Sequence, residues 1–149
     1  IVADAGHANG TRMRDYGGFG NTESHKAALL VECGQHWERT AEALAWQSTW
    51  RFLRALDAVD NDLAAAQIDH ARQPVQKVVR VTDALIASSL DYKFAPGLKG
   101  LSIVPNAGDL IATDAGKPVN APYDNCVLIM PTLVHVKPGL TAVRIGRVE

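Results

Sequence analysis

The sequence lacks the features that direct a chain to a membrane, a nucleic acid or a disulfide framework. Only two cysteines occur in 149 residues, and they form no C-x-x-C pair, so buried free thiols in a reducing compartment are expected. An excess of one charge is also lacking, because 15 lysines and arginines face 16 aspartates and glutamates. We therefore expect neither a nucleic acid nor an anionic membrane surface as a partner.

Long apolar runs are missing as well. No stretch approaches the ~20 residues that a membrane-spanning helix needs, and the opening IVADAGHANG has no basic-then-apolar export signal. A cytoplasmic chain is therefore expected. With 47% hydrophobic residues the chain can still bury a core, enough for one domain or two small ones. Its first residue is Ile1 and not methionine, which favours a piece of a longer protein.

The first half of the chain has mainly helical patterning. Residues 1–21 indicate a short strand and then a glycine-rich loop, and the apolar run 28–33 fits a buried strand of a parallel sheet. Over 37–59 apolar residues recur every three or four positions in two stripes, which predicts a helix covered on two sides. Helix formers continue over 60–73, and Pro74 ends them.

Short β-branched and apolar runs follow, separated by turns rich in glycine, proline, asparagine and aspartate. Strands are predicted at 75–81, 101–104, 109–113, 126–130 and 140–145. This spacing is typical of a compact β-sandwich or a partly open barrel. We therefore predict an α/β chain in which residues 1–60 form the C-terminal part of an α/β domain. Residues 61–74 form a linking helix, and residues 75–149 form a small all-β domain.

Glu32 stands out as an acid within the apolar run Leu29–Cys33. Burying a carboxylate costs several kcal/mol unless the group is paired or functional. In the structural interpretation Glu32 lies at the exposed end of the strand and forms an ion pair; the candidate partners are Arg12, Arg14 and Arg39. In the functional interpretation it is a general base, because the active crevice of an open parallel sheet lies beyond the carboxyl ends of the strands.

The block Leu29-Leu-Val-Glu-Cys-Gly-Gln-His36, followed by a long helix, resembles the catalytic-glutamate strand of the succinylglutamate desuccinylase/aspartoacylase family, which is related to the zinc carboxypeptidases. The segments Gly108-Asp-Leu-Ile-Ala112 and Asn120-Ala-Pro-Tyr-Asp124 are similar to the β domain that follows in those proteins. The resemblance implies a zinc-carboxypeptidase-like α/β domain and hydrolysis of N-acyl amino acids. It also implies one zinc ion as cofactor and Glu32 as the catalytic residue that moves the proton of a water.

The zinc ligands that the resemblance implies are missing from the sequence. The family uses an H-x-x-E pair and a later Asp-x-His element, whereas this chain has no H-x-x-E, and Asp4-Ala-Gly-His7 has one residue too many. We therefore expect no metal ligands in this chain and place the zinc ligands upstream of it. The chain by itself is then an inactive piece of a zinc-dependent amidohydrolase.

Four residues near Glu32 are candidates for binding the substrate. Arg12 and Arg14 lie in the glycine-rich loop, where either guanidinium could hold a substrate carboxylate through two hydrogen bonds. Tyr16 lies in the same loop, and His36 either lines the cleft or caps the following helix. The alternative for the arginines is that both are solvated loop cations.

A binding module without catalysis is the alternative function. A lipoyl- or biotinyl-type β module needs a lysine on a tight hairpin between apolar flanks. Lys117, in Asp-Ala-Gly-Lys-Pro, is the nearest match, but its flanks are not apolar. The sequence therefore favours the hydrolase, with a small acyl amino acid or a related small molecule as partner, and leaves formation of a homo-oligomer open.

Overall fold

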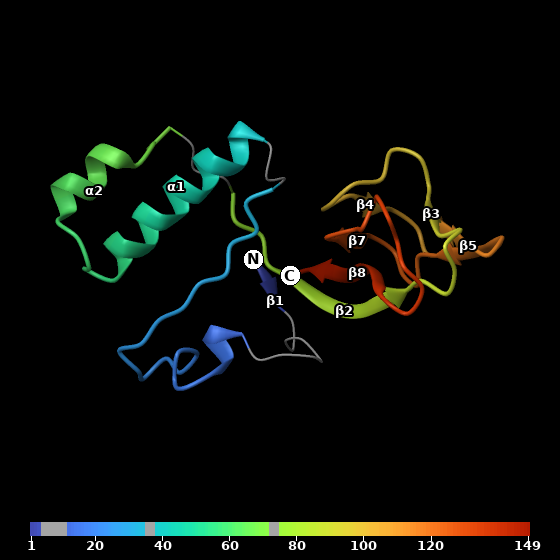
Figure 1. The fold of residues 1–149 in the computed structure, drawn as a ribbon, viewed down its shortest axis with the longest axis horizontal. Helices are drawn as coiled ribbons and strands as arrows, with labels where there is room; N and C mark the ends of the chain where they lie inside the picture. The colour runs from blue at the N-terminus through green and yellow to red at the C-terminus, as the bar shows by residue number, and fades with distance from the viewer. Residues whose placement is uncertain (4–11, 35–37, 72–74) are drawn as a thin grey trace. The chain divides into compact units, whose positions relative to one another are not determined.

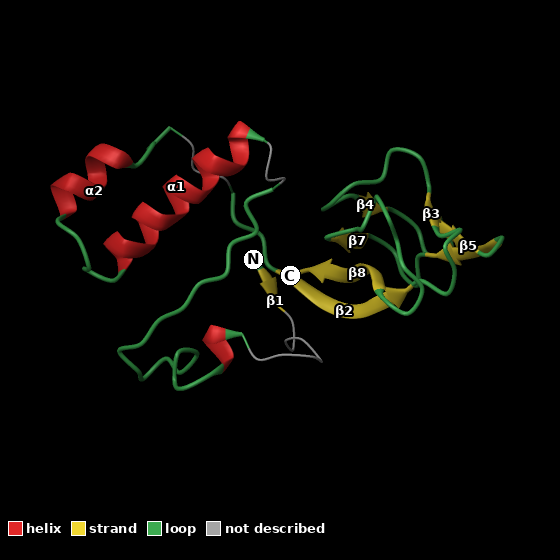
Figure 2. Cartoon of the chain, in the orientation of Figure 1, coloured by secondary structure: helices red, strands yellow, loops and turns green. Residues whose placement is uncertain are grey.

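The computed structural model describes residues 1–3, 12–34, 38–71 and 75–149. The chain is of mixed α/β type and divides into two compact units (Figure 1). We call Gly6–Val75 the helical unit, and Ile1–Ala5 together with Gln76–Glu149 the β unit. As Figure 2 shows, the described helices belong to the first unit and the described strands to the second.

The helical unit contains α1 (Arg39–Ala55), α2 (Asn61–Gln67) and a short 3-10 helix, η1 (Met13–Asp15). Helix α1 lies within the predicted range 37–59, and α2 lies within 60–73. Helix α2 begins after Asp60 because this carboxylate accepts hydrogen bonds from the backbone N–H groups of residues 62 and 63, each 3.0 Å long.

Helix α1 holds the end of α2 through the side chain of Gln47. The amide group of Gln47 donates a hydrogen bond to the backbone carbonyl of Gln67 (2.9 Å) and accepts one from the backbone N–H of Asp69 (2.8 Å). The backbone groups that a helix leaves unpaired at its C-terminus are satisfied in this way. The two helices are therefore joined by polar contacts as well as by packing.

The prediction that α1 is covered on two sides is wrong. Among its described residues Ala41 alone is buried, and Trp46 exposes 53% of its surface. The ring of Trp46 packs edge-on against that of Trp50, with 5.8 Å between the ring centroids. Two apolar stripes need two neighbouring layers, whereas the described part of the helical unit offers one other α-helix.

The prediction of a buried strand at 28–33 is also wrong. The structure forms no strand there, and Leu29 and Leu30 each expose 59% of their surface. An apolar run becomes a strand only where a neighbouring strand exchanges backbone hydrogen bonds with it. The described part of the helical unit contains no strand that could do so. We call residues 26–34 the open segment.

The β unit contains two sheets in the described part of the chain. One has five strands in the order β1-β2-β8-β7-β4, and the other has three in the order β3-β5-β6. The pair β1·β2 is parallel and the remaining pairs are antiparallel. The strands are β1 (Val2–Ala3), β2 (Val79–Ile86), β3 (Lys93–Phe94), β4 (Ile103–Val104), β5 (Leu110–Asp114), β6 (Lys117–Asn120), β7 (Cys126–Ile129) and β8 (Thr141–Val148).

The five predicted runs after Pro74 each overlap a strand, namely β2, β4, β5, β7 and β8. The sequence pattern does not predict β3 or β6. Strand β3 is only two residues long, and β6 contains Pro118, which has no backbone N–H to donate. The proline is tolerated because β6 lies at the edge of its sheet.

The core of the β unit is formed by apolar side chains from both sheets, including Ile111 of β5, Leu128 of β7 and Ile145 of β8. Every residue of β7 is buried. Cys126 is a free thiol within this core, as predicted, whereas the free thiol of Cys33 is only half-buried. Burial raises the pKa of the Cys126 thiol, which keeps it in the unreactive protonated form.

Two titratable groups lie beside each other in the β unit. The buried Asp114 carboxylate accepts hydrogen bonds from the Ser89 hydroxyl (2.7 Å) and from the backbone N–H of Ser88 (2.6 Å). These bonds lower the pKa of Asp114. Burial, with a smaller contribution from the Asp114 charge, raises the pKa of Tyr92 from 10.0 to about 12. The Tyr92 hydroxyl has no hydrogen-bond partner among the described residues.

The raised pKa of Tyr92 predicts a loss of stability at alkaline pH. The folded state disfavours the phenolate form of Tyr92. The resulting contribution to the free energy of unfolding is therefore fully present below pH 10.0 and is lost as the pH rises towards about 12. Tyr92→Phe keeps the ring and removes the ionising hydroxyl, so the melting temperature should fall less steeply over that range. Thermal unfolding at a series of pH values measures the difference. Tyr16→Phe is the control, because Tyr16 is 71% exposed; an equal flattening in both variants would contradict the prediction.

Candidate functional site

Glu32 lies on the open segment, two residues before a glycine that turns the chain towards α1. Gly34 has a φ of 116°, in the region that glycine adopts far more readily than other residues. A Cβ atom at Gly34 would lie 3.7 Å from the Cβ of Ala41, in the first turn of α1. The glycine therefore brings the end of the apolar run close to the N-terminal turn of the helix.

The Glu32 side chain is exposed and has no ion-pair partner among the described residues. The ion pair between Glu32 and Arg12, Arg14 or Arg39, which the structural interpretation of Glu32 predicts, is therefore not formed. The argument from burial cost fails as well, because the run that contains Glu32 is open to solvent. What remains is an accessible carboxylate whose charge is not neutralised by any cation in the described part of the chain.

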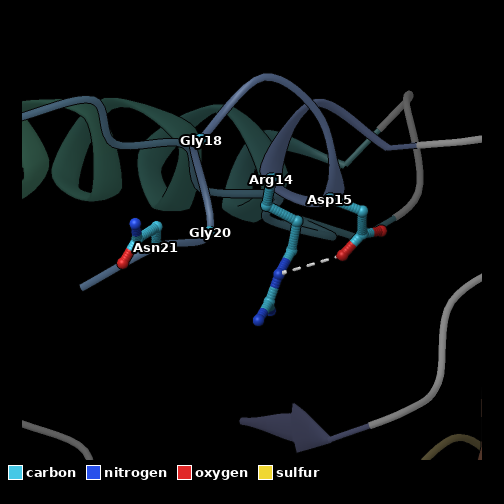
Figure 3. Close-up of a pocket in the computed structure, with 5 residues that line it drawn as sticks. All are labelled: Arg14, Asp15, Gly18, Gly20 and Asn21. Atoms are coloured by element: carbon cyan, nitrogen blue, oxygen red, sulfur yellow. Dashed lines mark ion pairs between the residues drawn. The ribbon is translucent and has the colours of Figure 1, made fainter. Parts of the chain in front are cut away.

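The loop after η1 borders an open polar hollow of about 400 Å³, lined by Arg14, Asp15, Gly18, Gly20 and Asn21 (Figure 3). A side chain at position 20 would bring its Cβ to 2.3 Å from the Arg14 carbonyl oxygen. Glycine is therefore required where the loop folds back on η1. The side chain of Arg14 extends away from the loop backbone into open space, with Asp15 beside it (Figure 3).

Asp15 forms ion pairs with both Arg12 and Arg14 at this hollow. Arg12 donates to it from Nε, with 2.6 Å to Oδ2, and the Nε of Arg14 lies 3.8 Å from Oδ1. Among the described residues, two guanidinium groups therefore lie near the Asp15 carboxylate. A guanidinium has five N–H donors, so Arg14 keeps donors for a small anion such as a carboxylate.

The predicted substrate-binding residues are not all in one place. Arg14 lines the hollow, Arg12 supports it through Asp15, and Tyr16 lies beside it but is not among the lining residues. His36 lies outside the described residues, as does His7. Glu32 is not among the lining residues either, so the structure does not bring the predicted base and the arginines into one described site.

Sequence reasoning missed Asp15 and Asn21 as parts of this hollow. A signal for Asp15 was present, since Arg12 and Asp15 are spaced i,i+3 and face each other on one helical turn. Asn21 had no such signal, because it reaches the hollow only through the way the glycine loop folds.

A zinc site is not formed by the residues that the structure describes. In those ranges no group of three or more His, Cys, Asp or Glu side chains could hold a metal ion, whereas a zinc site needs three or four convergent protein ligands. The described residues thus do not fit the zinc ion that the family resemblance implies.

Lys117, the basis of the alternative function, follows the two-residue turn between β5 and β6. The turn residues are Ala115 and Gly116, both with positive φ, as in the common β-hairpin turns. Lys117 pairs with Asp114 across the hairpin. The lysine therefore lies on a strand beside an acidic residue and not at the tip of the turn.

A second polar cluster, on the β unit, has a structural role. Thr82 and Tyr123 share a hydrogen bond between their hydroxyl groups, and the Arg147 guanidinium lies 3.8 Å from the centre of the Tyr123 ring. Burial raises the pKa of Tyr123. These contacts tie β2, β8 and the loop before β7 together.

Comparisons with known proteins found a weak likeness to solved structures. No protein-family model matches the sequence, and no curated protein matches it. The fold is similar to the X-ray structure of a succinylglutamate desuccinalase from Vibrio parahaemolyticus, with 20% sequence identity and a TM-score of 0.45. The match covers 83% of this chain and 33% of that chain, so this chain spans about a third of the length of that structure.

A likeness of this size assigns neither a family nor an activity to the chain. Family membership therefore rests on the sequence block around Glu32 and is a proposal.

None of the helices in the described ranges is both long enough and apolar enough to cross a bilayer.

Proposed function

We propose that the chain is part of a hydrolase that cleaves the amide bond of N-acyl amino acids and that Glu32 is its general base. One observation carries the proposal: an exposed acid, with no ion-pair partner in the described ranges, lies near the end of an apolar run, two residues before a glycine turn that precedes the long helix α1. The sequence block of the desuccinylase/aspartoacylase family has this same order of apolar run, acid, glycine and helix.

The chemistry of amide hydrolysis explains why such a carboxylate is needed. Water attacks the carbonyl carbon and must lose a proton, and the leaving amine nitrogen must gain one. A carboxylate within hydrogen-bond distance of the water can accept the first proton and deliver it to the amine. Glu32 suits this task because water reaches its side chain and no described cation holds its charge.

Binding of the substrate carboxylate is a separate part of the proposal. An N-acyl amino acid always carries the α-carboxylate, and Arg14 offers it guanidinium donors in the polar hollow. Arg12 contributes through Asp15, which it holds beside Arg14. In this role Arg14→Ala weakens substrate binding, whereas loss of Glu32 slows the chemical step.

Zinc enters the proposal only as the cofactor of a longer protein. The described residues provide no ligand set, so the ligands would be supplied by residues outside them. The longer protein would also contribute the rest of the substrate cleft.

The proposed function is tested by measuring zinc binding and hydrolysis for two proteins, the 149-residue chain and a longer protein that contains it. The 149-residue chain should bind zinc no more tightly than other proteins with scattered histidines, and it should not hydrolyse N-acyl amino acids. A longer protein that includes it should bind one zinc ion and release free amino acid. Titration calorimetry measures the first property and amine release the second. The proposal fails if the longer protein binds zinc but cleaves no N-acyl amino acid in a broad panel.

A further inference from the structure

The open segment is an apolar stretch of chain that no other described element covers. Leu29 and Leu30 are more than half exposed, and Val31 is 38% exposed. Among the described residues, no backbone hydrogen bond links residues 27–33 to another segment. Unpaired backbone groups beside apolar side chains are what an edge strand presents to another strand.

The charges at the two ends of this segment are self-complementary. Lys26 precedes the apolar residues and Glu32 follows them, each three positions from Leu29. If two copies pair antiparallel about a twofold axis at Leu29, each Lys26 lies directly opposite the Glu32 of the other copy. Opposite charges at facing positions stabilise an antiparallel pair, whereas like charges destabilise it. A register centred on any other residue does not place these two side chains opposite each other.

The apolar side chains also match in this register. On one face Ala28 lies opposite Leu30 of the second copy, so each large side chain meets a small one. On the other face the two Leu29 side chains meet at the twofold axis, and Ala27 lies opposite Val31. Both faces are therefore apolar between the two Lys26–Glu32 pairs, and a shift by one residue would separate the charges.

We propose that residues 26–32 form an intermolecular β-strand, through which the chain pairs antiparallel with a second copy of itself about Leu29. The present contacts of Lys26 allow this pairing. Its ammonium group donates to the Gly17 carbonyl oxygen at 2.9 Å and lies 5.6 Å from the centre of the Phe19 ring. An ammonium has three donors, so Lys26 can keep the Gly17 bond and also meet Glu32 of the second copy.

This pairing concerns association of the 149-residue chain, and it engages the same Glu32 carboxylate that the proposed hydrolysis needs as its base. Lys26 separates the two proposals experimentally because it has no part in the proposed chemistry. Lys26→Glu should weaken pairing of the 149-residue chain and leave hydrolysis by a longer protein intact.

Charge reversal tests the pairing directly. Sedimentation velocity over a wide range of concentration should show that the wild-type chain dimerises. Glu32→Lys and Lys26→Glu each replace two attractive pairs by two repulsive ones, so each should raise the dimer dissociation constant by about tenfold or more. The double variant Lys26→Glu/Glu32→Lys restores opposite charges and should regain most of the wild-type affinity. Glu23→Lys, an exposed acid outside the pairing residues, is the matched control.

Cysteine cross-linking tests the register. Residues directly opposite each other in an antiparallel pair have Cα atoms about 4.5 to 5.5 Å apart, which suits a disulfide. In a Cys33→Ser background, Leu29→Cys should therefore form a disulfide-linked dimer on mild oxidation. Ala28→Cys and Leu30→Cys should cross-link efficiently only when the two variants are mixed.

Three results would overturn the proposal. One is a wild-type chain that remains monomeric at every concentration. Another is a double charge variant that associates no better than the two single variants. The third is cross-linking that is equally efficient for cysteine at positions 28, 29 and 30, since that pattern indicates random collision.

Discussion

Replacing Glu32 by glutamine should lower kcat for hydrolysis of an N-acyl amino acid by about 10²- to 10⁴-fold in a longer protein that contains this chain. Glutamine has nearly the same shape and keeps most hydrogen bonds of the carboxylate, but it cannot accept the proton of a water. The loss should appear in kcat as well as in kcat/KM, because the interaction is made in the transition state and not with the bound substrate.

The structure also predicts what this substitution leaves unchanged. Glu32 is exposed and has no ion-pair partner in the described ranges, so its neutralisation should alter the free energy of unfolding by no more than about 0.5 kcal/mol. Glu23→Gln removes another exposed acid of the same unit and should change neither kcat nor the melting temperature. Near-normal kcat together with a lower melting temperature in Glu32→Gln would show that Glu32 is a structural residue.

The local parts of the fold could be predicted from the sequence. Helix α1 follows from apolar residues at helical spacing, and the start of α2 follows from a capping residue, Asp60. The strands β2, β5, β7 and β8 follow from short β-branched runs between turn residues. Each of these signals is contained in a few neighbouring residues, which is why it could be recognised without knowledge of the rest of the chain.

The open segment was mispredicted because strand formation depends on distant residues. Leu29, Leu30 and Val31 suit a strand, but a strand also needs a neighbour to exchange backbone hydrogen bonds, and a single apolar run carries no information about that neighbour. The two-sided covering of α1 was mispredicted for a similar reason. An apolar stripe indicates which face can be buried, and the number of packing partners decides whether it is buried.

The candidate site could be predicted only residue by residue. Glu32 was predicted because an acid interrupts an apolar run, although the structure shows that the run is exposed. The hollow beside Arg14 depends on the backbone of a glycine-rich loop, where Gly20 lets the chain fold closely on η1. Such a three-dimensional arrangement has no simple spacing in the sequence, so the grouping of Arg14, Asp15 and Asn21 emerges only from the fold.

The largest expected effect on stability is at Leu128 in the core of the β unit. Its side chain is fully buried among residues of both sheets. Its backbone is hydrogen-bonded to the segment just before β4. The Leu128 N–H donates to the Ser102 carbonyl oxygen (2.9 Å), and the Leu128 carbonyl oxygen accepts from the Leu101 N–H (2.7 Å). Because these bonds prevent β7 from moving to fill a cavity, Leu128→Ala should lower the free energy of unfolding by about 2 to 5 kcal/mol.

Chemical denaturation can assign this loss to the β unit, because the two units carry different aromatic reporters. All three tryptophans lie in the helical unit, whereas Tyr92 and Tyr123 lie in the β unit. The third tyrosine, Tyr16 of the helical unit, is already 71% exposed, so its absorbance should change little on unfolding. In Leu128→Ala the urea midpoint followed by tyrosine absorbance should fall, and the midpoint followed by tryptophan emission should stay unchanged. Leu90→Ala is the matched control, because Leu90 is 78% exposed and its loss should change stability by no more than about 0.5 kcal/mol. An equal fall of both midpoints would show that the units unfold together, and equal losses in the two variants would show that Leu128 is not a core residue.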